Sequence, residues 1–129
     1  MVTYRTNPVQ LRFVDGLGYD DKDNERLVAE MSGGANIDNG QHAADDTLKV
    51  IHSLTCILKA DARNCPRASI STFKKLKAFG VQTVQTTMIL SEMYIDDDLK
   101  FVYKESRKAI VPRNYGQRQK QFAMAEMLA

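Results

Sequence analysis

LRFVDGLGYDDKDNERLVAEMSGGANI, residues 11–37, is the stretch that decides the predicted fold class. Where it begins, VQLRF (9–13) alternates apolar and polar side chains, which indicates a half-buried strand that ends at Asp15-Gly16. After a run of acidic residues suited to a helix N-terminus, ERLVAEM (25–31) carries an apolar stripe and predicts a helix that Gly33-Gly34 end. A strand that leads into a helix is typical of α/β proteins.

The rest of the chain continues this alternation of elements. The apolar residues between 48 and 59 fit either a buried strand or a helix, and their β-branched content favours a strand, with 54–58 as its firmest part. The other periodicities and turn signals predict short strands over 35–37 and 81–84, a turn at Asn39-Gly40, and helices over 70–79, 88–94, 99–108 and 115–129.

Composition bounds the class of protein. The chain has 129 residues, of which 43% are hydrophobic and 26% charged, enough for one core and too little for two ordinary domains. No apolar run approaches the roughly 20 residues of a membrane span, and two cysteines are too few for a disulfide framework. We therefore expect a soluble protein of a reducing compartment with no membrane partner. The expected fold is a single α/β domain over residues 1–129, a small central sheet flanked by helices, with 96–129 as a basic C-terminal helical extension.

Charge is unevenly distributed. Residues 1–64 carry 7 basic and 10 acidic side chains, a net of −3, whereas residues 65–129 carry 11 basic and 6 acidic, a net of +5. Such a cationic end suits an anionic partner, although a solvated surface is the simpler interpretation. The six basic residues of this candidate interaction segment are Lys104, Arg107, Lys108, Arg113, Arg118 and Lys120.

The last predicted helix adds an apolar cluster to this segment. Phe122, Met124, Met127 and Leu128 are large apolar side chains near the end of a small chain. Either they pack on the core of the same chain, or they bury against a partner, and a two-fold pairing is the commonest way to cover such a surface. We expect a homodimer in which this helix contributes to the interface.

Chemically reactive motifs are weak. The acidic run at 20–25 lacks the glycine and glutamate of a calcium loop, and the run at 96–98 could hold a magnesium ion with a phosphate. Both are better explained as helix N-termini. The histidines and cysteines do not have zinc-ligand spacing, and FVDGLG (13–18) lacks the lysine of a phosphate loop. Only Asp15 and Cys65 remain for a small enzyme, the least favoured hypothesis. We predict no catalytic residue, cofactor or metal.

In their order along the chain, the predicted elements resemble a BRCT domain, a small α/β module that binds other proteins. FVDGLG (13–18) is similar to the end of its first strand, ERLVAEM (25–31) to its first helix and Gly33-Gly34 to its glycine pair. SLTCILKAD (53–61) and STFKKLKAFGVQTV (71–84) resemble the following strand, helix and strand.

Two departures from the BRCT pattern limit what the resemblance implies. The family's tryptophan is absent, and Met88 would take its place, buried against the helix that carries Phe73 and Leu76. We also expect a positive φ at Gly33 or Gly34, which would close the first predicted helix. Asp15 stands where the family grips phosphate, so phosphopeptide binding does not transfer.

The chain as a whole is similar to the packaging and assembly cofactor of cystoviruses, segmented double-stranded RNA bacteriophages. Residues 11–37 carry this resemblance. It implies a homodimeric inner-capsid protein that contacts viral capsid and polymerase proteins, stabilises the procapsid and assists RNA packaging and transcription, in the virion and in the cytoplasm of the infected bacterium. It also implies that a mobile tail follows Ala129. The leading hypothesis is thus a non-enzymatic interaction module, and an RNA-binding protein that uses the basic segment is the alternative.

Overall fold

A single mixed sheet of five strands organises the protein. The computed structural model describes residues 2–3, 11–12, 14–31 and 40–129. The sheet has the order β3-β4-β5-β6-β7, in which β4 and β5 run parallel and every other neighbouring pair is antiparallel. Its strands are β3 (Gly16–Tyr19), β4 (Glu25–Met31), β5 (Ala78–Val84), β6 (Thr87–Ile95) and β7 (Phe101–Ile110). The chain is therefore α/β, as expected from the sequence.

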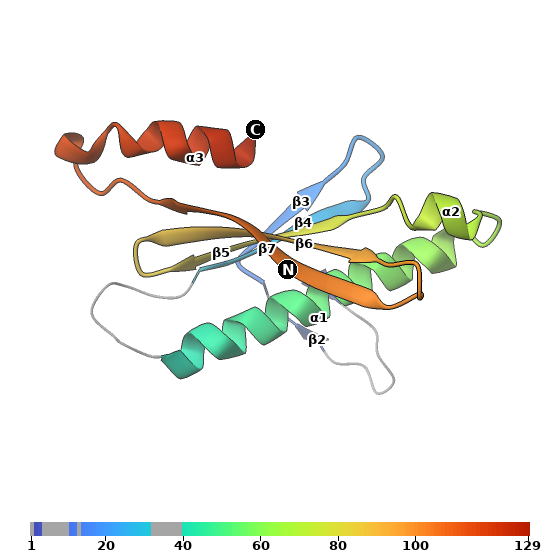
Figure 1. Cartoon of the computed structure of the whole chain (residues 1–129). Helices are drawn as coiled ribbons and strands as arrows, with labels where there is room; N and C mark the ends of the chain where they lie inside the picture. Colours follow the sequence, from blue (N-terminus) through green and yellow to red (C-terminus); the bar gives the residue numbers. More distant parts are fainter. Residues whose placement is uncertain (1, 4–10, 13, 32–39) are drawn as a thin grey trace.

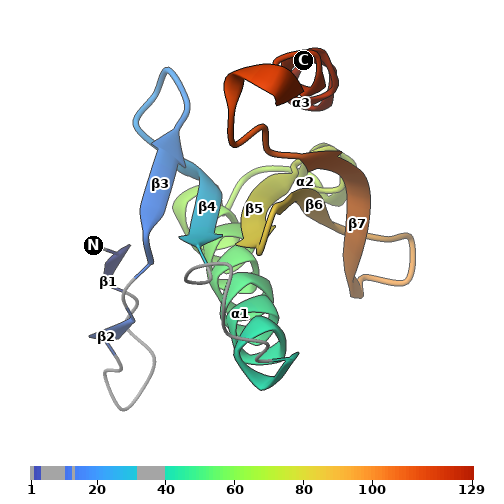
Figure 2. The same cartoon turned by 90° about the vertical axis from the view of Figure 1, so that its left-hand side faces the viewer.

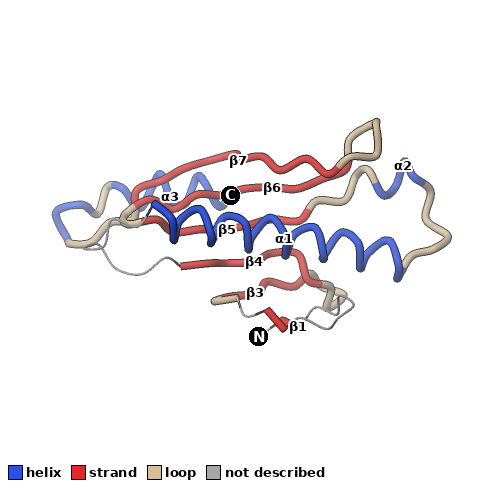
Figure 3. Tube along the Cα trace, turned by 90° about the horizontal axis from the view of Figure 1, so that it is seen from below, coloured by secondary structure: helices blue, strands red, loops and turns tan. Residues whose placement is uncertain are grey.

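Helices occupy both sides of this sheet. The 25-residue helix α1 (Gly40–Asn64) connects the parallel strands and runs along one face (Figures 1 and 3). On the opposite face, α3 (Lys120–Leu128) lies over the β7 side and leaves β3 and β4 uncovered (Figure 2). The smaller elements are β1 (Val2–Thr3) and β2 (Leu11–Arg12), which pair with each other, the short helix α2 (Ile70–Phe73), and the 3-10 turn η1 (Tyr115–Gln117).

The core lies between α1 and what we call the inner sheet face. Val50, Leu54, Ile57 and Leu58 recur at helical spacing and are buried. They pack with Val28, Ala78 and Met93 of the sheet. At the centre, the backbone of Gly80 lies so close to α1 that an added Cβ would stand 2.6 Å from Val50 Cγ1. Gly80 thus sets how closely the helix approaches β5.

The hairpins β3–β4 and β6–β7 use the same five-residue turn. In each turn an aspartate, Asp20 or Asp96, accepts hydrogen bonds from the backbone N–H groups two and four residues later. The fourth residue has a positive φ of 61°, and it is Asp23 in one turn and Leu99 in the other. These acidic runs are therefore hairpin turns, and their interpretation as helix N-termini is wrong.

The prediction of a helix over 25–31 is also wrong, because these residues form β4. Val28 and Glu30 alternate toward α1 and are buried, while Leu27, Ala29 and Met31 occupy the other face. Because a charged residue lies inside and apolar residues lie outside, the polarity of the strand is inverted. As a result, the apolar Leu27, Val28 and Met31 come from both faces of the strand, and together they have the spacing of a helical stripe.

Four further assignments of secondary structure are corrected. Residues 48–59, for which a strand was favoured over a helix, lie within α1, since their spacing matches the buried helical stripe described above. Residues 88–94 and 99–108, taken as helices, lie largely within β6 and β7. Both faces of β6 carry apolar side chains, so its sequence shows no clean alternation. Of the helix predicted over 70–79, only α2 forms.

Other predictions are confirmed. Residues 81–84 belong to β5, and α3 with η1 accounts for most of the helix predicted over 115–129. Thus the extension 96–129 is helical only after β7. The strand over 9–13 is described only at β2, and Gly33-Gly34, the strand over 35–37 and Asn39 lie outside the described residues.

The BRCT likeness stays a prediction, and two of the segments that carried it have the other secondary structure. ERLVAEM is a strand and SLTCILKAD is helical. Met88 is half-buried on β6, opposite Thr83 at the end of the β5–β6 hairpin. The contact expected with Phe73 and Leu76 does not follow, because these residues precede the opposite end of β5.

Candidate interaction surface

The sheet face that points away from α1, here called the outer sheet face, is largely apolar. Strand partners share a face, and Leu27 pairs with Phe79, and Ala29 with Val81, on the side opposite the buried Val28. Across the next pair, Val81 lies opposite Leu90. Apolar side chains therefore extend from β4 to β6 on this face.

Helix α3 covers one side of the outer sheet face. It packs against β7, and Met127 and Ala109 are buried there. Toward β4 the face opens, and Met31 at the end of that strand is 65% exposed. The outer sheet face is thus covered on the β7 side and open on the β4 side (Figure 2).

A hydrogen bond from β7 holds α3 in place. Arg107 Nη1 donates to the backbone carbonyl of Glu126 at 2.7 Å and to that of Met127 at 3.4 Å. Carbonyls in the last turn of a helix have no partner within the helix, and a cation beside them also suits the helix dipole. Arg107, one of the predicted interaction residues, therefore helps to hold α3 against the sheet.

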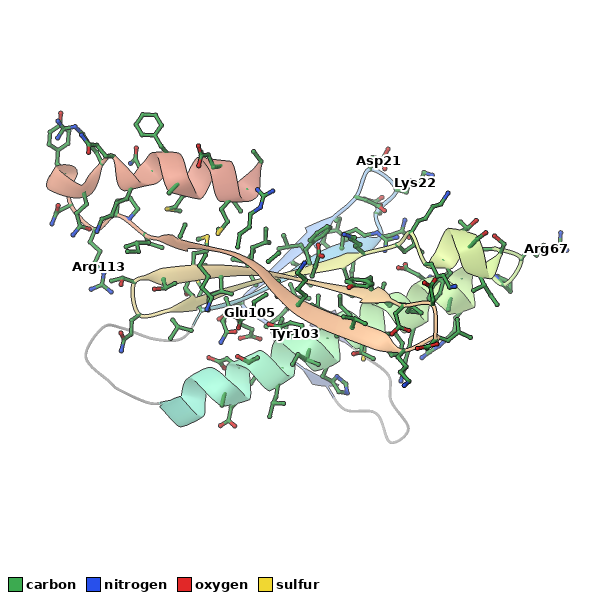
Figure 4. The ribbon with its side chains drawn as sticks, in the orientation of Figure 1. Asp21, Lys22, Arg67, Tyr103, Glu105 and Arg113 are labelled. Carbon is green, nitrogen blue, oxygen red and sulfur yellow. The ribbon has the colours of Figure 1, made fainter. Side chains whose placement is uncertain are left out.

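The structure does not gather the six predicted basic residues into one patch. Lys104 and Arg107 belong to the outer side of β7, whereas Lys108 belongs to the inner side and pairs with Glu105 at 3.2 Å. Arg118 stacks over the Tyr115 ring, 4.4 Å from its centroid. The remaining two lie apart from these: Arg113 beside the β5–β6 turn (Figure 4) and Lys120 at the start of α3.

The predicted apolar cluster of α3 is divided. Met127 is buried against this chain's own sheet, Met124 is half-buried and Phe122 is 75% exposed. Packing onto the same chain, one of the two alternatives left open by the sequence, therefore accounts for Met127. Phe122, which is largely exposed, remains accessible to a partner.

Charged residues on the inner sheet face support β4 from below. Arg26 bridges Asp20 of the hairpin turn and Asp61 of α1. Hydrogen bonds from the backbone of Asn24 hold the pKa of the Asp20 carboxyl well below its usual range. Burial raises the pKa of Glu30, whose Oε1 has no hydrogen-bond partner among the described residues. Strand β4, which carries the open part of the outer sheet face, therefore has charged residues on its inner side, among them the buried Glu30.

The residues considered for catalysis and metal binding do not converge. Cys65 is exposed after α1, while Asp15 accepts a hydrogen bond from the Met31 backbone at 2.7 Å. His52 Nδ1 and Cys56 Sγ lie one helical turn apart at 3.5 Å. Over the described ranges 14–31 and 40–129, no three histidine, cysteine or acidic side chains are grouped to hold a metal.

None of the helices in the described part of the chain is both long enough and apolar enough to cross a membrane.

The open outer sheet face was missed by the sequence analysis. A partial signal was present in ERLVAEM, where the apolar Leu27, Ala29 and Met31 occupy alternate positions, but the apolar Val28 between them obscured it. Comparison with protein-family models, curated proteins and solved structures gives no significant match for this chain.

Proposed function

We propose that this protein is a non-enzymatic assembly cofactor that acts through protein–protein contacts. The observation that carries the proposal is the outer sheet face, whose apolar side chains continue past α3 to the exposed Met31. Contiguous exposed apolar surface is typical of interaction sites. Phe122 on α3 provides a second exposed apolar group, and a large aromatic residue is a common anchor at interfaces.

The proposed partners follow from the resemblance to the cystovirus cofactor. They are the viral capsid and polymerase proteins and a second copy of this chain. In that setting the protein would act in the inner capsid and in the cytoplasm of the infected bacterium, stabilising the polymerase-containing procapsid during RNA packaging and transcription. Contacts over an apolar face suit this role, because they stabilise an assembly without chemistry.

RNA binding through the basic segment is the alternative. The excess of positive charge from β7 to α3 favours it, but Arg107 and Lys108 are engaged on opposite sides of β7. A salt titration separates the two functions, since RNA affinity that depends on phosphate contacts falls steeply as salt rises. Apolar contacts between proteins lack that dependence.

In-vitro assembly of procapsids from the capsid and polymerase proteins encoded with this chain tests the proposal. We expect the wild-type chain to increase the yield of particles and Met31→Asp to lose this effect. Leu48→Asp is the matched control, because Leu48 is 64% exposed on α1, away from the outer sheet face. Equal activity of both variants, or no effect of the wild type, would contradict the proposed function.

A further inference from the structure

Strand β7 is a ten-residue edge strand whose second side is unpaired by any described strand. Figure 2 shows it at the border of the sheet, with α3 above the sheet rather than alongside β7. Glu105, Ser106, Arg107 and Lys108 along this border are all exposed. An open edge presents backbone donors and acceptors that another strand can pair with.

We propose that β7 pairs antiparallel with β7 of a second copy about a two-fold axis, which joins two sheets into one. This deepens the proposed function by naming the surface that a second copy uses. The sequence of β7 is self-complementary in one register, and that property identifies the occupant as the same chain.

A β-bulge determines which residues of β7 share a face. The pairing with β6 shifts between Leu90 and Ser91, so that Ser91 lies opposite Glu105 and Leu90 opposite Arg107. The extra residue, Ser106, places Glu105 and Lys108 on the same inner side, which their ion pair confirms. Figure 4 shows Tyr103 and Glu105 on the side of β7 that faces α1.

Residues opposite each other in an antiparallel pair must share a face, and this requirement leaves two registers centred on the bulge. In one, Lys104 of each copy faces Arg107 of the other, which places like charges together on both sides of the axis. In the other, Glu105 of each copy faces Lys108 of the other. The second register therefore has two opposite-charge pairs and is the one we assign.

The assigned register also matches the neighbouring side chains. Tyr103 of one copy lies opposite Ile110 of the other, an aromatic and β-branched pair of the kind that stabilises sheets. Ile110 is 46% exposed in the single chain, so the pairing would cover it. Lys104 lies opposite the small Ala109 rather than directly opposite Arg107. Charged edge residues discourage indiscriminate pairing, and here they select one arrangement.

Charge reversal tests the pairing. Sedimentation velocity of the full chain at micromolar concentrations should show a dimer. Glu105→Lys and Lys108→Glu should each raise the dimer dissociation constant roughly tenfold, because each places like charges across both symmetric contacts. The double variant should restore it. Lys74→Glu has the same charge change as Lys108→Glu but breaks only a surface pair with Asp97, and it should leave the dimer unchanged.

Cross-linking tests the register independently of dimer affinity. In a chain with Cys56 and Cys65 replaced by Ala, Tyr103→Cys with Ile110→Cys should give a covalent dimer on oxidation. These positions are too far apart along one strand to join within a chain. Phe101→Cys with Ile110→Cys is the matched control for the like-charge register, and preferential cross-linking there would overturn the assigned one.

A chain that stays monomeric, or a dimer indifferent to both single charge reversals, would overturn β7 pairing. Circular dichroism of each variant separates loss of the dimer from loss of the fold. A monomer that still promotes procapsid assembly through Met31 would refute the pairing alone, whereas a dimer without assembly activity would refute the proposed function alone.

Discussion

Arg107 on β7 donates a hydrogen bond of 2.7 Å to the backbone carbonyl of Glu126 in the last turn of α3. This bond joins the edge strand to the helix that covers the β7 side of the outer sheet face. The position of α3, and so the extent of the open surface, therefore depends on this guanidinium as well as on the burial of Met127, although Arg107 was predicted to contact an external partner.

Arg107→Ala should loosen α3 from the sheet. A hydrogen bond from a charged donor contributes about 1.5–3 kcal/mol, so we expect α3 to open more readily by about 1–2 kcal/mol and Met127 to become accessible. Hydrogen exchange read by mass spectrometry over 120–128 measures this. Arg113→Ala is the control, because its contact with the Gln85 carbonyl lies at 3.5 Å and away from α3. Equal exchange in wild type and Arg107→Ala would show that apolar packing alone holds the helix.

Gly80→Ala should destabilise the whole fold. The added Cβ would meet Val50 Cγ1 and Ser91 Oγ at 2.6 Å each, so α1 or β6 must shift. Overpacking of this kind costs about 1–3 kcal/mol. Urea denaturation followed by circular dichroism measures the change. Gly116→Ala, where the nearest atom is Asn114 Oδ1 at 3.3 Å in an exposed turn, should cost much less. If Gly80→Ala left the free energy of unfolding unchanged, α1 would pack less closely on β5 than the structure indicates.

Glu30→Gln should stabilise the protein by about 1 kcal/mol at neutral pH, because it removes a buried charge whose Oε1 has no partner in the described part of the chain. Burial raises the pKa of Glu30 above its ordinary 4.5, against a smaller opposite effect of Lys49. The folded state therefore favours the protonated acid. That contribution is complete below the unfolded pKa and is lost as pH rises through the folded pKa.

Denaturation of both proteins above and below pH 4.5 measures this difference for Glu30. The advantage of Glu30→Gln should shrink as pH falls toward and below that value, since wild-type Glu30 is then also neutral. The same substitution at exposed Glu126 is the control. A stability difference that does not change with pH would contradict the burial of a titrating carboxylate.

Leu99→Gly should stabilise the β6–β7 turn by about 0.5–1 kcal/mol. Leu99 has a φ of 61°, a conformation that costs a non-glycine residue about 1–2 kcal/mol, and its side chain is exposed. The melting temperature should therefore rise. Asp98→Gly, at the preceding residue without a positive φ, should lower it. A fall for both variants would show that Leu99 makes compensating contacts.

The fold could be predicted from the sequence only where polarity and burial agree. The last helix and the strand over 81–84 were predicted, and the spacing of Val50, Leu54 and Leu58 was visible although β-branched content outweighed it. In β4 the pattern misleads, because Glu30 is buried while Met31 is exposed. Local spacing cannot show that inversion, since it depends on which side α1 covers.

Prediction of the interaction residues from the sequence is limited in the same way. Lys104 and Arg107 were identified as exposed basic residues, but their sequence does not show that they lie on the edge of a sheet. As an edge strand, β7 has few buried side chains, so its polar sequence resembled a solvated helix. The bulge at Ser106, which places Glu105 and Lys108 on one side, becomes evident only from the pairing with β6.

The parallel pairing of β4 with β5 has a consequence for the order of folding. Leu27 lies beside Phe79, so this pair closes a far longer loop than any hairpin of the sheet. In contrast, β5, β6 and β7 form consecutive hairpins with short turns, which are local in sequence and form quickly. The three-strand meander should therefore precede the docking of β4, and pulsed hydrogen exchange during refolding should protect β6 before β4. Until that late step the strand edge of β5 is exposed, and a nascent chain is then most prone to aggregate.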